Sequence, residues 1–506
     1  MLKLELGSLY LSLSGTDSAT LKVIDEVTSY AVEGAWYSSA FRSKQWDGRV
    51  HLLTFSHTNG YRVYSGCTAD VVQALKNECI PFSYTDLRRF PVPTVSHGWT
   101  GTILTPHGPE DFSARPYQVE AAKAMLGASF PLGRCMLKLP IRSGKTCVGA
   151  MVIAALGVPT LFVVSSDLLL DQTVKLYRSM FRSPIGIVGA GVWEPTNLTV
   201  ATIQTLHGHL GTPEFSELMN RVDLAIFDEC HHLQPGSKPA KAAAAVSAKA
   251  AAAGKTKKKD SLGWKDIVVR CPAYYKLGLS ATIYLDQKKG NEKANIWLKA
   301  ATGNIVYEVT TKRMIEEGWL LRPIIEIHKV HGPVVTGDWT EDEVHRRGIV
   351  NYLNRNAAIV RLGVEEVRTG SRVMVHAHHH EHIDLLTEAF EAAGVVVAKL
   401  SGKVKGATRK GILTKFRHGN VKMLVGNIFG EGLDVPEVDV VIVAEGGESR
   451  KKTIQRLRNL TPSPGKEYVK VHDFLDQHEA HLLKHSRARL KAYKDEDAFD
   501  IRMMGD

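Results

Sequence analysis

Two short motifs constrain this chain more than any other feature: a phosphate-binding loop and, downstream of it, a pair of adjacent carboxylates. The loop ends in Ser-Gly-Lys-Thr at residues 143–146, and the apolar run 224–227 is followed directly by Asp228 and Glu229. A buried strand that ends in carboxylates carries them to the carboxyl edge of a parallel sheet, where ligands bind in open α/β folds. Either motif alone recurs by chance, but together and in this order they predict an ATP-binding α/β domain.

The chemistry of these side chains assigns each of them a role. A loop that opens a helix offers free amides and the positive end of the helix dipole to phosphates, while Lys145 neutralises the β and γ oxygens. Thr146 is then expected to ligate Mg²⁺, and Asp228 to hold the same ion through water. Glu229 is left to polarise the attacking water. The predicted cofactors are ATP and Mg²⁺.

Composition bounds the number of domains and the class of binding partner. A chain of 506 residues with 44% apolar residues predicts three or four domains with cores of their own. The net charge of +11 indicates a polyanionic partner, although charge alone speaks only of non-specific attraction. Six cysteines without paired spacing suit a reducing compartment and no structural zinc.

The uncharged stretch 146–166 is long enough to imitate a membrane span. Gly157, Val158 and Pro159 break it, so it reads as the phosphate-loop helix followed by a strand. The amino terminus alternates polar and apolar residues instead of carrying a basic flank and an apolar block. We therefore expect no membrane segment, no signal peptide and a cytoplasmic location, in the host cytoplasm if the chain is phage-encoded.

Short apolar runs alternate with helical stretches twice along the chain, which is typical of parallel sheets covered by helices. The expected strands are 160–164, 198–202, 224–227 and 275–279 in the first set, and 372–375, 395–399, 421–425 and 438–443 in the second. The sequence thus predicts an α/β protein with two successive parallel sheets.

Domain boundaries follow from these runs. We expect an α+β accessory domain at 1–95, a first sheet domain at 96–305, a second at 306–480 and a terminal helix and tail at 481–506. Within the first, residues 236–263 are rich in Ala and Lys, with seven lysines and one aspartate. Such a composition cannot bury a core, so the segment is a flexible surface insertion or a tethered nucleic-acid contact.

The remaining motifs resemble those of superfamily 2 helicases and occur in that family's order over most of residues 111–475. They are Ala-Arg-Pro-Tyr-Gln at 114–118, the phosphate loop at 139–146, a DECH box at 228–231, Ser-Ala-Thr at 280–282, strand-end loops at 165–166 and 200–204, and the segments 426–436 and 455–458. The resemblance implies two tandem RecA-like domains that close on ATP, with a small α+β accessory domain ahead of them.

The resemblance also implies roles for individual residues. Nucleotide binding extends to Arg115, Gln118, Arg142, Ser143, Gly144, Gly432 and Asp434, with Gln118 reading adenine. Coupling of hydrolysis to strand movement falls to His231, Ser280 and Thr282. Contacts with the nucleic acid fall to Ser165, Thr202, Gln204, His378, Gly426 and Asn427. Arg456 and Arg458 occupy the place of the arginine finger.

The run 40–50 resembles the accessory domain of the UvsW family of phage helicases. Arg42, Lys44 and Arg49 offer phosphate contacts, and Trp46 an aromatic face for a base. The alternative is that Trp46 is a core residue above an Asp-Gly turn.

Two positions depart from the family pattern. Arg142 stands where a glycine is usual, so it either crowds the loop at a position that needs positive φ, costing roughly 1 kcal/mol, or adds a charge to the phosphates. Leu139 also replaces a small residue. In the finger motif, Asn459 and Pro462 stand in place of arginines. Both departures bear on turnover more than on nucleotide binding.

Residues 376–382 contain five histidines. Imidazoles at alternate positions of a strand end could ligate zinc. The run also falls where the family contacts nucleic acid, so a solvated or backbone-contacting loop is the expected reading.

The resemblance to superfamily 2 and to the UvsW family implies an ATP-dependent DNA helicase or translocase that remodels forks, four-way junctions and RNA–DNA hybrids in phage replication, recombination and repair. The expected partners are branched or single-stranded DNA and replication or recombination proteins, and the chain is expected to act as a monomer. One alternative is a nucleic-acid-binding or annealing protein with little ATP turnover. The other is the motor subunit of a restriction or repair complex, although the chain has no recognisable nuclease carboxylate cluster.

Overall fold

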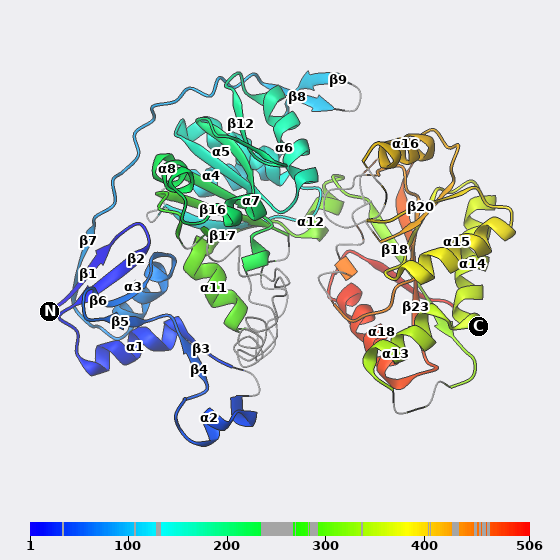
Figure 1. Ribbon diagram of the computed structural model, residues 1–506, viewed down its shortest axis with the longest axis horizontal. Coiled ribbons are helices and arrows are strands. Elements are labelled where there is room, and N and C mark those ends of the chain that lie inside the picture. Colours follow the sequence, from blue (N-terminus) through cyan, green and yellow to red (C-terminus); the bar gives the residue numbers. More distant parts are fainter. Residues whose placement is uncertain are drawn as a thin grey trace. The chain divides into compact units, whose positions relative to one another are not determined.

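The chain divides into two compact units (Figure 1). The first comprises Met1–Pro140 and Gly144–Glu308, and the second Val309–Asp506 with Ile141–Ser143. The computed structural model describes all residues except 33–34, 106–107, 128–132, 234–266, 269, 282, 284–291, 335–336, 338, 403, 405, 428–434, 450–452, 455–456, 458–461, 463–465 and 506. Within the described residues, no helix combines the length and the apolar character that a membrane crossing requires.

The first unit begins with a small α+β region built on a five-stranded sheet. Its strands lie in the order β5 (Thr54–Ser56), β6 (Gly60–Tyr64), β2 (Tyr10–Ser14), β1 (Leu2–Leu6), β7 (Phe82–Asp86). Strand β1 alternates buried leucines with exposed charges, as expected for a sheet with one wet face. Helices α1 (Ser18–Thr28) and α3 (Thr68–Asn77) contribute to its core, and a hairpin of β3 (Ser29–Ala31) and β4 (Arg49–His51) encloses η1 (Ala35–Tyr37) and α2 (Ser39–Arg42).

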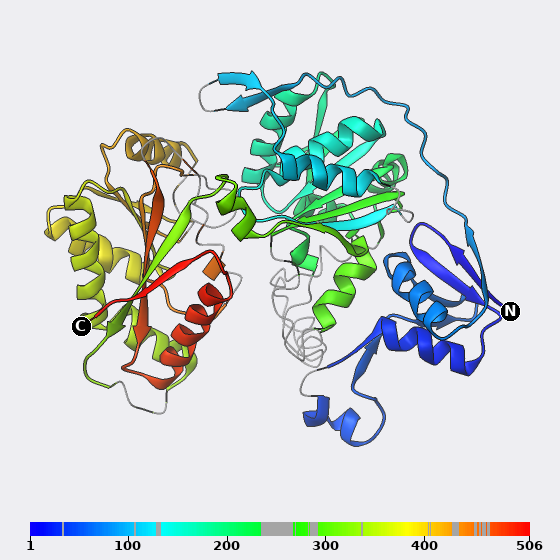
Figure 2. The ribbon, with the colours of Figure 1, turned by 180° about the vertical axis from the view of Figure 1, so that it is seen from behind.

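An extended connection, residues 87–101, leads from this sheet to the rest of the unit and is visible from behind in Figure 2. Its backbone is bonded along much of its length: the amides of Thr94 and Val95 donate to Gly157 O at 3.0 Å, and Thr100 N donates to Met180 O at 2.9 Å. A hairpin of β8 (Thr102–Thr105) and β9 (Gly108–Asp111) follows. The connection is therefore anchored to the part of the first unit that carries its main sheet, the first lobe.

The main sheet of the first unit is parallel except at one edge. Its order is β13 (Val192–Glu194), β12 (Ile185–Gly189), β14 (Leu198–Thr202), β11 (Thr160–Val164), β15 (Leu224–Asp228), β16 (Tyr275–Ser280), β10 (Arg134–Lys138), β17 (Ile305–Glu308). The strands expected at 160–164 and 198–202 have those bounds, and β15 and β16 are one residue longer than expected. Uninterrupted apolar runs form central strands because both faces of the sheet are covered.

Helices cover the two faces of this sheet. They are α4 (Pro116–Leu126), α5 (Lys145–Leu156), α6 (Asp167–Met180), α7 (Ile203–Gly208), α8 (Pro213–Arg221) and α11 (Glu292–Thr302). Leu161 and Val163 pack with α7, α8 and α11, whereas Phe162 contacts Tyr177 of α6 on the other face. Each fully buried large apolar side chain contributes about 1.5–3 kcal/mol. The uncharged stretch 146–166 is thus a helix, a turn at Gly157 and a strand, as expected.

Helix α11 also serves the N-terminal sheet. Ile296, Trp297 and Ala300 pack into the core of that sheet, with the rings of Trp297 and Tyr64 at 5.5 Å. Lys299 Nζ lies 3.1 Å from Asp70 Oδ2. The N-terminal sheet and the first lobe therefore share one helix.

The second unit is a parallel sheet in the order β20 (Val397–Leu400), β21 (Met423–Gly426), β19 (Val373–His376), β22 (Val440–Val443), β23 (Tyr468–Asp476), β18 (Arg322–Val330), β24 (Asp500–Met503). The strands expected there begin one or two residues later than predicted. Its helical segments are α12 (Thr311–Glu316), α13 (Glu341–His345), η4 (Arg346–Val350), α14 (Leu353–Arg368), α15 (His380–Ala392), α16 (Gly406–Arg417) and α18 (Ala480–Lys494). The predicted fold is confirmed: two parallel α/β sheets follow a small α+β region.

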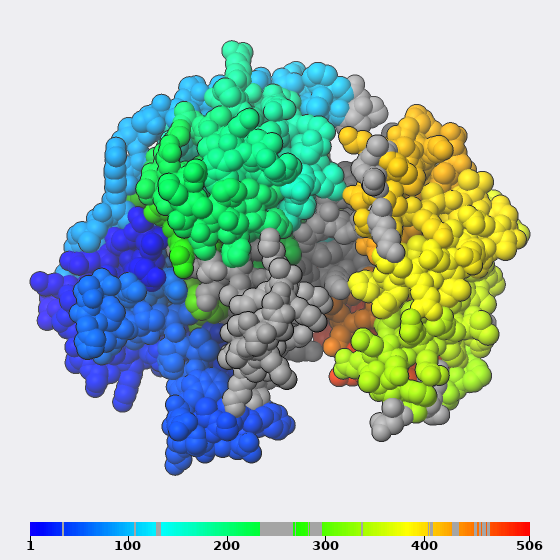
Figure 3. Space-filling view, viewed as in Figure 1, coloured from blue at the N-terminus to red at the C-terminus, as the bar shows by residue number. Residues whose placement is uncertain are grey.

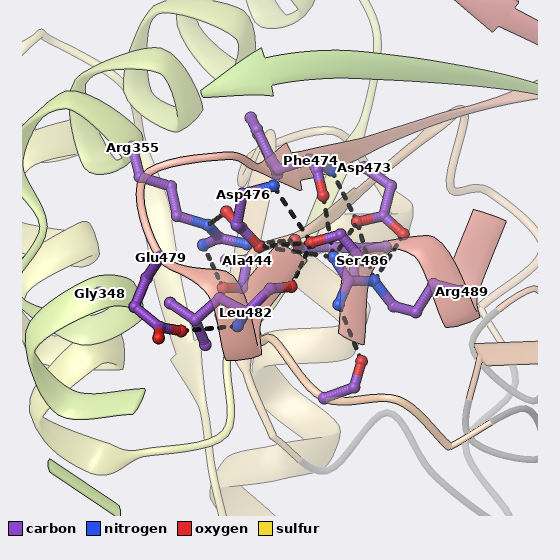
Figure 4. A network of polar contacts seen from close by, with 12 residues as sticks. Gly348, Arg355, Ala444, Asp473, Phe474, Asp476, Glu479, Leu482, Ser486 and Arg489 are labelled. Carbon is purple, nitrogen blue, oxygen red and sulfur yellow. Dashed lines mark hydrogen bonds and ion pairs between the residues drawn. The ribbon is translucent and has the colours of Figure 1, made fainter. Parts of the chain in front are cut away.

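The end of the chain, expected as a terminal helix and tail at 481–506, forms a helix and an edge strand of the second unit. Helix α18 packs on β23, and β24 pairs in parallel with β18 as an edge strand. Figure 4 shows the buried ion pairs beneath α18. Arg489 Nε of α18 lies 3.0 Å from Asp473 Oδ2 of β23, and Arg355 Nε of α14 lies 2.9 Å from Asp476 Oδ1 of the same strand. Because these charges are fully buried and paired, the helix belongs to the core of the second unit.

Candidate functional site

The candidate ATP site lies where three adjacent parallel strands of the first unit end. Strand β16 runs between β15 and β10, in register with both. The phosphate loop follows β10, Asp228 ends β15 and Ser280 ends β16. Motifs far apart in the sequence therefore meet at one edge of one sheet, as the sequence predicts.

The phosphate loop is built on two residues with left-handed backbone. Arg142 has a φ of 68° and Gly144 a φ of 72°. The strained position considered for Arg142 is thus the observed one. At Gly144 a side chain is disfavoured twice, by the positive φ and because an added Cβ would lie 2.5 Å from Gln118 Nε2, which would have to move. Gln118 is buried at the start of α4, where its Oε1 accepts from Arg115 N at 2.9 Å as part of the helix cap. Its role in reading adenine stays a prediction.

The acidic pair sits on a strained turn. Glu229 has a φ of 52°, and its amide donates to Asp228 Oδ1 at 3.0 Å. Non-glycine residues in this conformation cost about 1–3 kcal/mol and cluster at functional sites. The turn points the Glu229 side chain away from the strand direction and toward neighbouring strand ends.

Three side chains surround the Glu229 carboxylate. Lys145 Nζ lies 3.9 Å from Oε1, His231 Nδ1 lies 3.1 Å from Oε2, and Ser280 Oγ donates to Oε2 at 3.3 Å. His231 Nδ1 and Ser280 Oγ are themselves 2.7 Å apart. The predicted catalytic carboxylate is therefore in direct contact with two of the predicted coupling residues.

Burial tunes the thiols beside this site. Burial raises the pKa of the Cys230 thiol well above its ordinary value, and the neighbouring carboxylates of Glu229 and Asp228 raise it further. Burial likewise raises the pKa of Cys147, in the first turn of α5, to about 11. Both cysteines are thus neutral packing groups at neutral pH, and all six in the chain are free thiols.

The donor set fits ATP and Mg²⁺. Helix α5 begins at Lys145, so first-turn amides without intrahelical acceptors face the end of the loop. The hydroxyl of Thr146 and the carboxylate of Asp228 are hard oxygen donors, which Mg²⁺ prefers. Lys145 and Glu229 are only about one tenth exposed, so their charges act in a partly dehydrated site.

The strand-end loops of the first unit converge as expected. Gln204 Nε2 donates to Ser165 O at 2.7 Å, which ties the ends of neighbouring strands β14 and β11. Gln204 is exposed. Thr202 is buried, however, and its hydroxyl donates to Thr205 Oγ1 at 2.9 Å. Gln204 and the Ser165 loop, not the Thr202 side chain, are the groups that can reach a nucleic acid.

The second unit has a similar pair at its strand ends. Asn427 Nδ2 donates to His378 O at 3.2 Å, and Ala377 N donates to Gly426 O at 2.9 Å. The exposed His378 ring lies 3.9 Å from Glu445 Oε2. Within the described residues, no member of the run 376–382 belongs to a group of three that could share a metal ion. The loop interpretation holds only for residues 377–379. His376 ends β19 and is buried, and residues 380–382 begin α15, where His382 is buried with its Nε2 2.9 Å from Asn356 Oδ1.

The N-terminal candidates lie in the α2 segment, residues 35–50, which Figure 3 shows projecting at the bottom of the blue N-terminal region. Arg42 and Lys44 are exposed. Trp46 is half-buried, with its indole N–H donating to Arg49 O at 2.6 Å. Arg49 is bonded to Ser29 through Nε at 3.1 Å and a terminal nitrogen at 2.9 Å. Trp46 is thus neither a core residue nor a free stacking face, and Arg49 secures the hairpin.

The same segment carries two aromatic residues that sequence reasoning missed. Trp36 and Tyr37 are 56% and 79% exposed, with ring centroids 5.6 Å apart. Exposed aromatics beside basic side chains are the usual elements of single-strand contacts. Two adjacent aromatic letters in a short segment were the only signal in the sequence, and they do not distinguish surface from core.

Several predicted site residues lie outside the described residues. They are Thr282, Gly432, Asp434, Arg456, Arg458 and the insertion 236–263.

Two family models match the chain. The family described as type III restriction enzyme, res subunit, matches residues 111–285, which include the phosphate loop and the acidic box. The helicase conserved C-terminal domain matches residues 354–458, within the second unit.

Similarity to individual proteins spans most of the chain. ATP-dependent DNA helicase uvsW of Enterobacteria phage T4 is 21% identical over 95% of this chain and 94% of its own length. DNA 3'-5' translocase XPB2 of Sulfurisphaera tokodaii is 23% identical, over 78% of this chain and 89% of its own. Among solved structures, the type ISP restriction-modification enzyme LlaBIII bound to DNA matches with a TM-score of 0.54 and 12% identity, covering 79% of this chain and 32% of that one.

Proposed function

We propose that this chain, an ATP-dependent DNA helicase or translocase of superfamily 2 related to UvsW and XPB, remodels forks and four-way junctions and unwinds RNA–DNA hybrids. The observation that carries the motor assignment is the arrangement of Lys145, Glu229, Ser280 and His231 at one sheet edge. The branched substrate rests on the similarity to uvsW, which extends through the N-terminal sheet as well as the motor.

In the proposed reaction, Lys145 and the first turn of α5 bind the triphosphate, and Thr146 with Asp228 would hold Mg²⁺. When bound, that ion neutralises charge on the phosphates. Glu229 accepts a hydrogen bond from the attacking water and orients it. Ser280 holds Oε2 of the same carboxylate, so a shift of the β16 end would alter the base directly. This contact gives a physical route from ATP chemistry to the strand ends.

We assign the nucleic-acid path to the strand-end loops of the two sheets and to the α2 segment. Gln204 and the Ser165 loop in the first unit, and His378 with Asn427 in the second, offer polar groups suited to a phosphate backbone. The α2 segment adds exposed cations and aromatic rings. The relative named as a 3'-5' translocase supports the same direction for this chain.

The motor assignment is tested with Lys145→Ala and Glu229→Gln in a steady-state ATPase assay with and without single-stranded DNA. Lys145→Ala should abolish DNA-stimulated hydrolysis without loss of the fold, since the lysine serves phosphate charge. Glu229→Gln should keep ATP affinity and lose turnover. Stimulated hydrolysis at the parental rate in either variant would reject that residue's role, and little turnover in the parent would favour the annealing-protein alternative.

The junction role is tested by substitution on the α2 segment. Deleting the N-terminal sheet would uncover Ile296 and Trp297 of α11, so deletion cannot separate binding from folding. We expect Trp36→Ala to weaken fork binding by about 1–3 kcal/mol per lost stacked base, with ATPase on saturating single strands retained. Lys44→Ala should reduce the salt slope of binding by about one. Lys76→Ala, an exposed lysine on α3, is the matched control.

Substrates decide between the finer alternatives. Forks, four-way junctions and RNA–DNA hybrids are compared with tailed duplexes of either polarity at matched salt. A parent that unwinds tailed duplexes as fast as junctions would contradict the branched-DNA proposal while leaving the motor intact. A chain that translocates on duplex without separating strands would favour the restriction-motor alternative, which the family match and the LlaBIII fold motivate.

A further inference from the structure

A cluster of potential metal ligands lies on the sheet of the second unit. Strands β18 and β23 pair in register, with Glu326 opposite His472 and His328 opposite Phe474. Because side chains alternate along a strand, Glu326, His328 and His472 share one face of the sheet. This brings two imidazoles and one carboxylate together from positions far apart in the chain.

The spacing of their ligand atoms suits one small cation. One ligand atom from each residue lies within 4.8 Å of the other two. His472 Nδ1 is 2.9 Å from His328 Nε2 and 3.3 Å from Glu326 Oε2. Ligand atoms around a tetrahedral zinc ion, with bonds of about 2.0–2.1 Å, are roughly 3.3 Å apart. The cluster thus needs only small side-chain movements to enclose an ion.

A second carboxylate orients the buried histidine. The other nitrogen of His472, Nε2, lies 3.1 Å from Glu366 Oε1 of α14, and Lys470 Nζ lies 2.7 Å from the same oxygen. Metal-binding histidines almost always donate their second N–H to a carboxylate, a carbonyl or water, which fixes the ring and its tautomer. With Nε2 protonated toward Glu366, the lone pair of Nδ1 faces His328 and Glu326.

That tautomer places no proton between Nδ1 and the Glu326 carboxylate, and when His328 carries its proton on Nδ1, all three ligand atoms offer lone pairs. A hydrogen bond can join two of them, whereas one divalent cation satisfies all three. His472 is buried, and Glu326 and His328 are half-buried, so the site is enclosed on one side and reachable on the other. Two imidazoles and a carboxylate favour zinc over Mg²⁺, which prefers oxygen ligands.

We propose that Glu326, His328 and His472 bind one Zn²⁺ ion, with Glu366 as a positioning residue and a water molecule as the fourth ligand. The absence of paired cysteines argued against structural zinc in the sequence, but these ligands are of another type. The ion would cross-link β18, the first strand of this unit along the chain, to β23.

The test uses the full-length, untagged chain after treatment with a chelator. Titration with Co²⁺, a coloured substitute for zinc, should reach one ion per chain with visible absorption typical of four-coordinate cobalt, and Zn²⁺ should displace it and raise the melting temperature. His328→Gln should remove the absorption. Glu366→Gln should weaken binding by roughly 10–100-fold while keeping the spectrum.

His380→Gln, an exposed member of the histidine run, is the matched control and should bind Co²⁺ as the parent does. Circular dichroism establishes that each variant is folded. If His472→Gln does not fold, His328→Gln and Glu326→Gln carry the test, because both residues are half-buried. Binding below one equivalent in the folded parent, binding unchanged in folded His328→Gln, or binding lost in His380→Gln would overturn the proposal.

Discussion

Replacing Ser280 with alanine isolates the contact between the end of β16 and the catalytic carboxylate. The Ser280 hydroxyl is fully buried, donates to Glu229 Oε2 at 3.3 Å and lies 2.7 Å from His231 Nδ1. The substitution removes one oxygen and adds no bulk. His231 stays 3.1 Å and Lys145 3.9 Å from Glu229, so the carboxylate keeps its other two partners.

The size of the effect follows from these distances. A hydrogen bond to a charged group contributes about 1.5–3 kcal/mol, and the 3.3 Å separation places this one at the weaker end. Since about 1.4 kcal/mol corresponds to a tenfold change in rate, we expect kcat for DNA-stimulated hydrolysis to fall about tenfold. KM for ATP should change little, because the hydroxyl faces the carboxylate and not the phosphate loop.

The assay is steady-state ATP hydrolysis at saturating single-stranded DNA, with kcat and KM determined separately. Thr387→Val is the matched control, since it removes an equally buried hydroxyl that bonds only to Ile383 O in α15. A kcat for Ser280→Ala within twofold of the parent would refute the argument. A raised KM with unchanged kcat would instead indicate that the hydroxyl stabilises the bound nucleotide and the transition state equally.

Three further predictions concern strain and buried charge. Arg142→Gly relieves a φ of 68°, about 1 kcal/mol, yet removes a cation; we expect KM for ATP to rise, and tighter binding with faster turnover would show that the arginine only crowds the loop. Burial lowers the pKa of Lys276 from 10.5 to about 7, so between these pH values the unfolded chain binds a proton that the folded chain lacks. The stability of the parent relative to Lys276→Met should therefore rise with pH across that window. Equal pH dependence in thermal melts of the two proteins would contradict this. Asp473→Asn leaves the buried Arg489 guanidinium without its main partner and should cost about 3–5 kcal/mol, seen as faster hydrogen exchange in α18, whereas Asp495→Asn in an exposed pair on the same helix should have almost no effect.

The central strands and the ATP site were predictable because their physics is local. Runs such as 160–164 are apolar throughout since both faces of the sheet are covered, and their bounds in the structure are the predicted ones. The positive φ of Arg142 followed from its place in a loop that usually has glycine there. Order along the chain was enough to bring Lys145 and Glu229 to one edge.

Features that depend on partners distant in sequence were not predictable. Arg355 reads as a surface residue of an amphipathic helix, and only the fold brings Asp476 within 2.9 Å of it. The edge strand Asp500–Met503 is short and partly exposed, so it carries no strong periodic signal. The family resemblance assigned Ser280 a role, but its bond to Glu229 appears only when β15 and β16 are adjacent.

The anchored connection 87–101 bears on how the α2 segment would follow a moving motor. A flexible linker of this length would let an attached domain move over a distance that scales with the square root of the number of linker residues. Bonds from Thr94, Val95 and Thr100 to the lobe remove that freedom, and the shared helix α11 fixes the N-terminal sheet from its other side. Any duplex held at the α2 segment would therefore stay at a constant separation from the ATP site. The part of a nuclease footprint that the first unit protects should then not vary with nucleotide state.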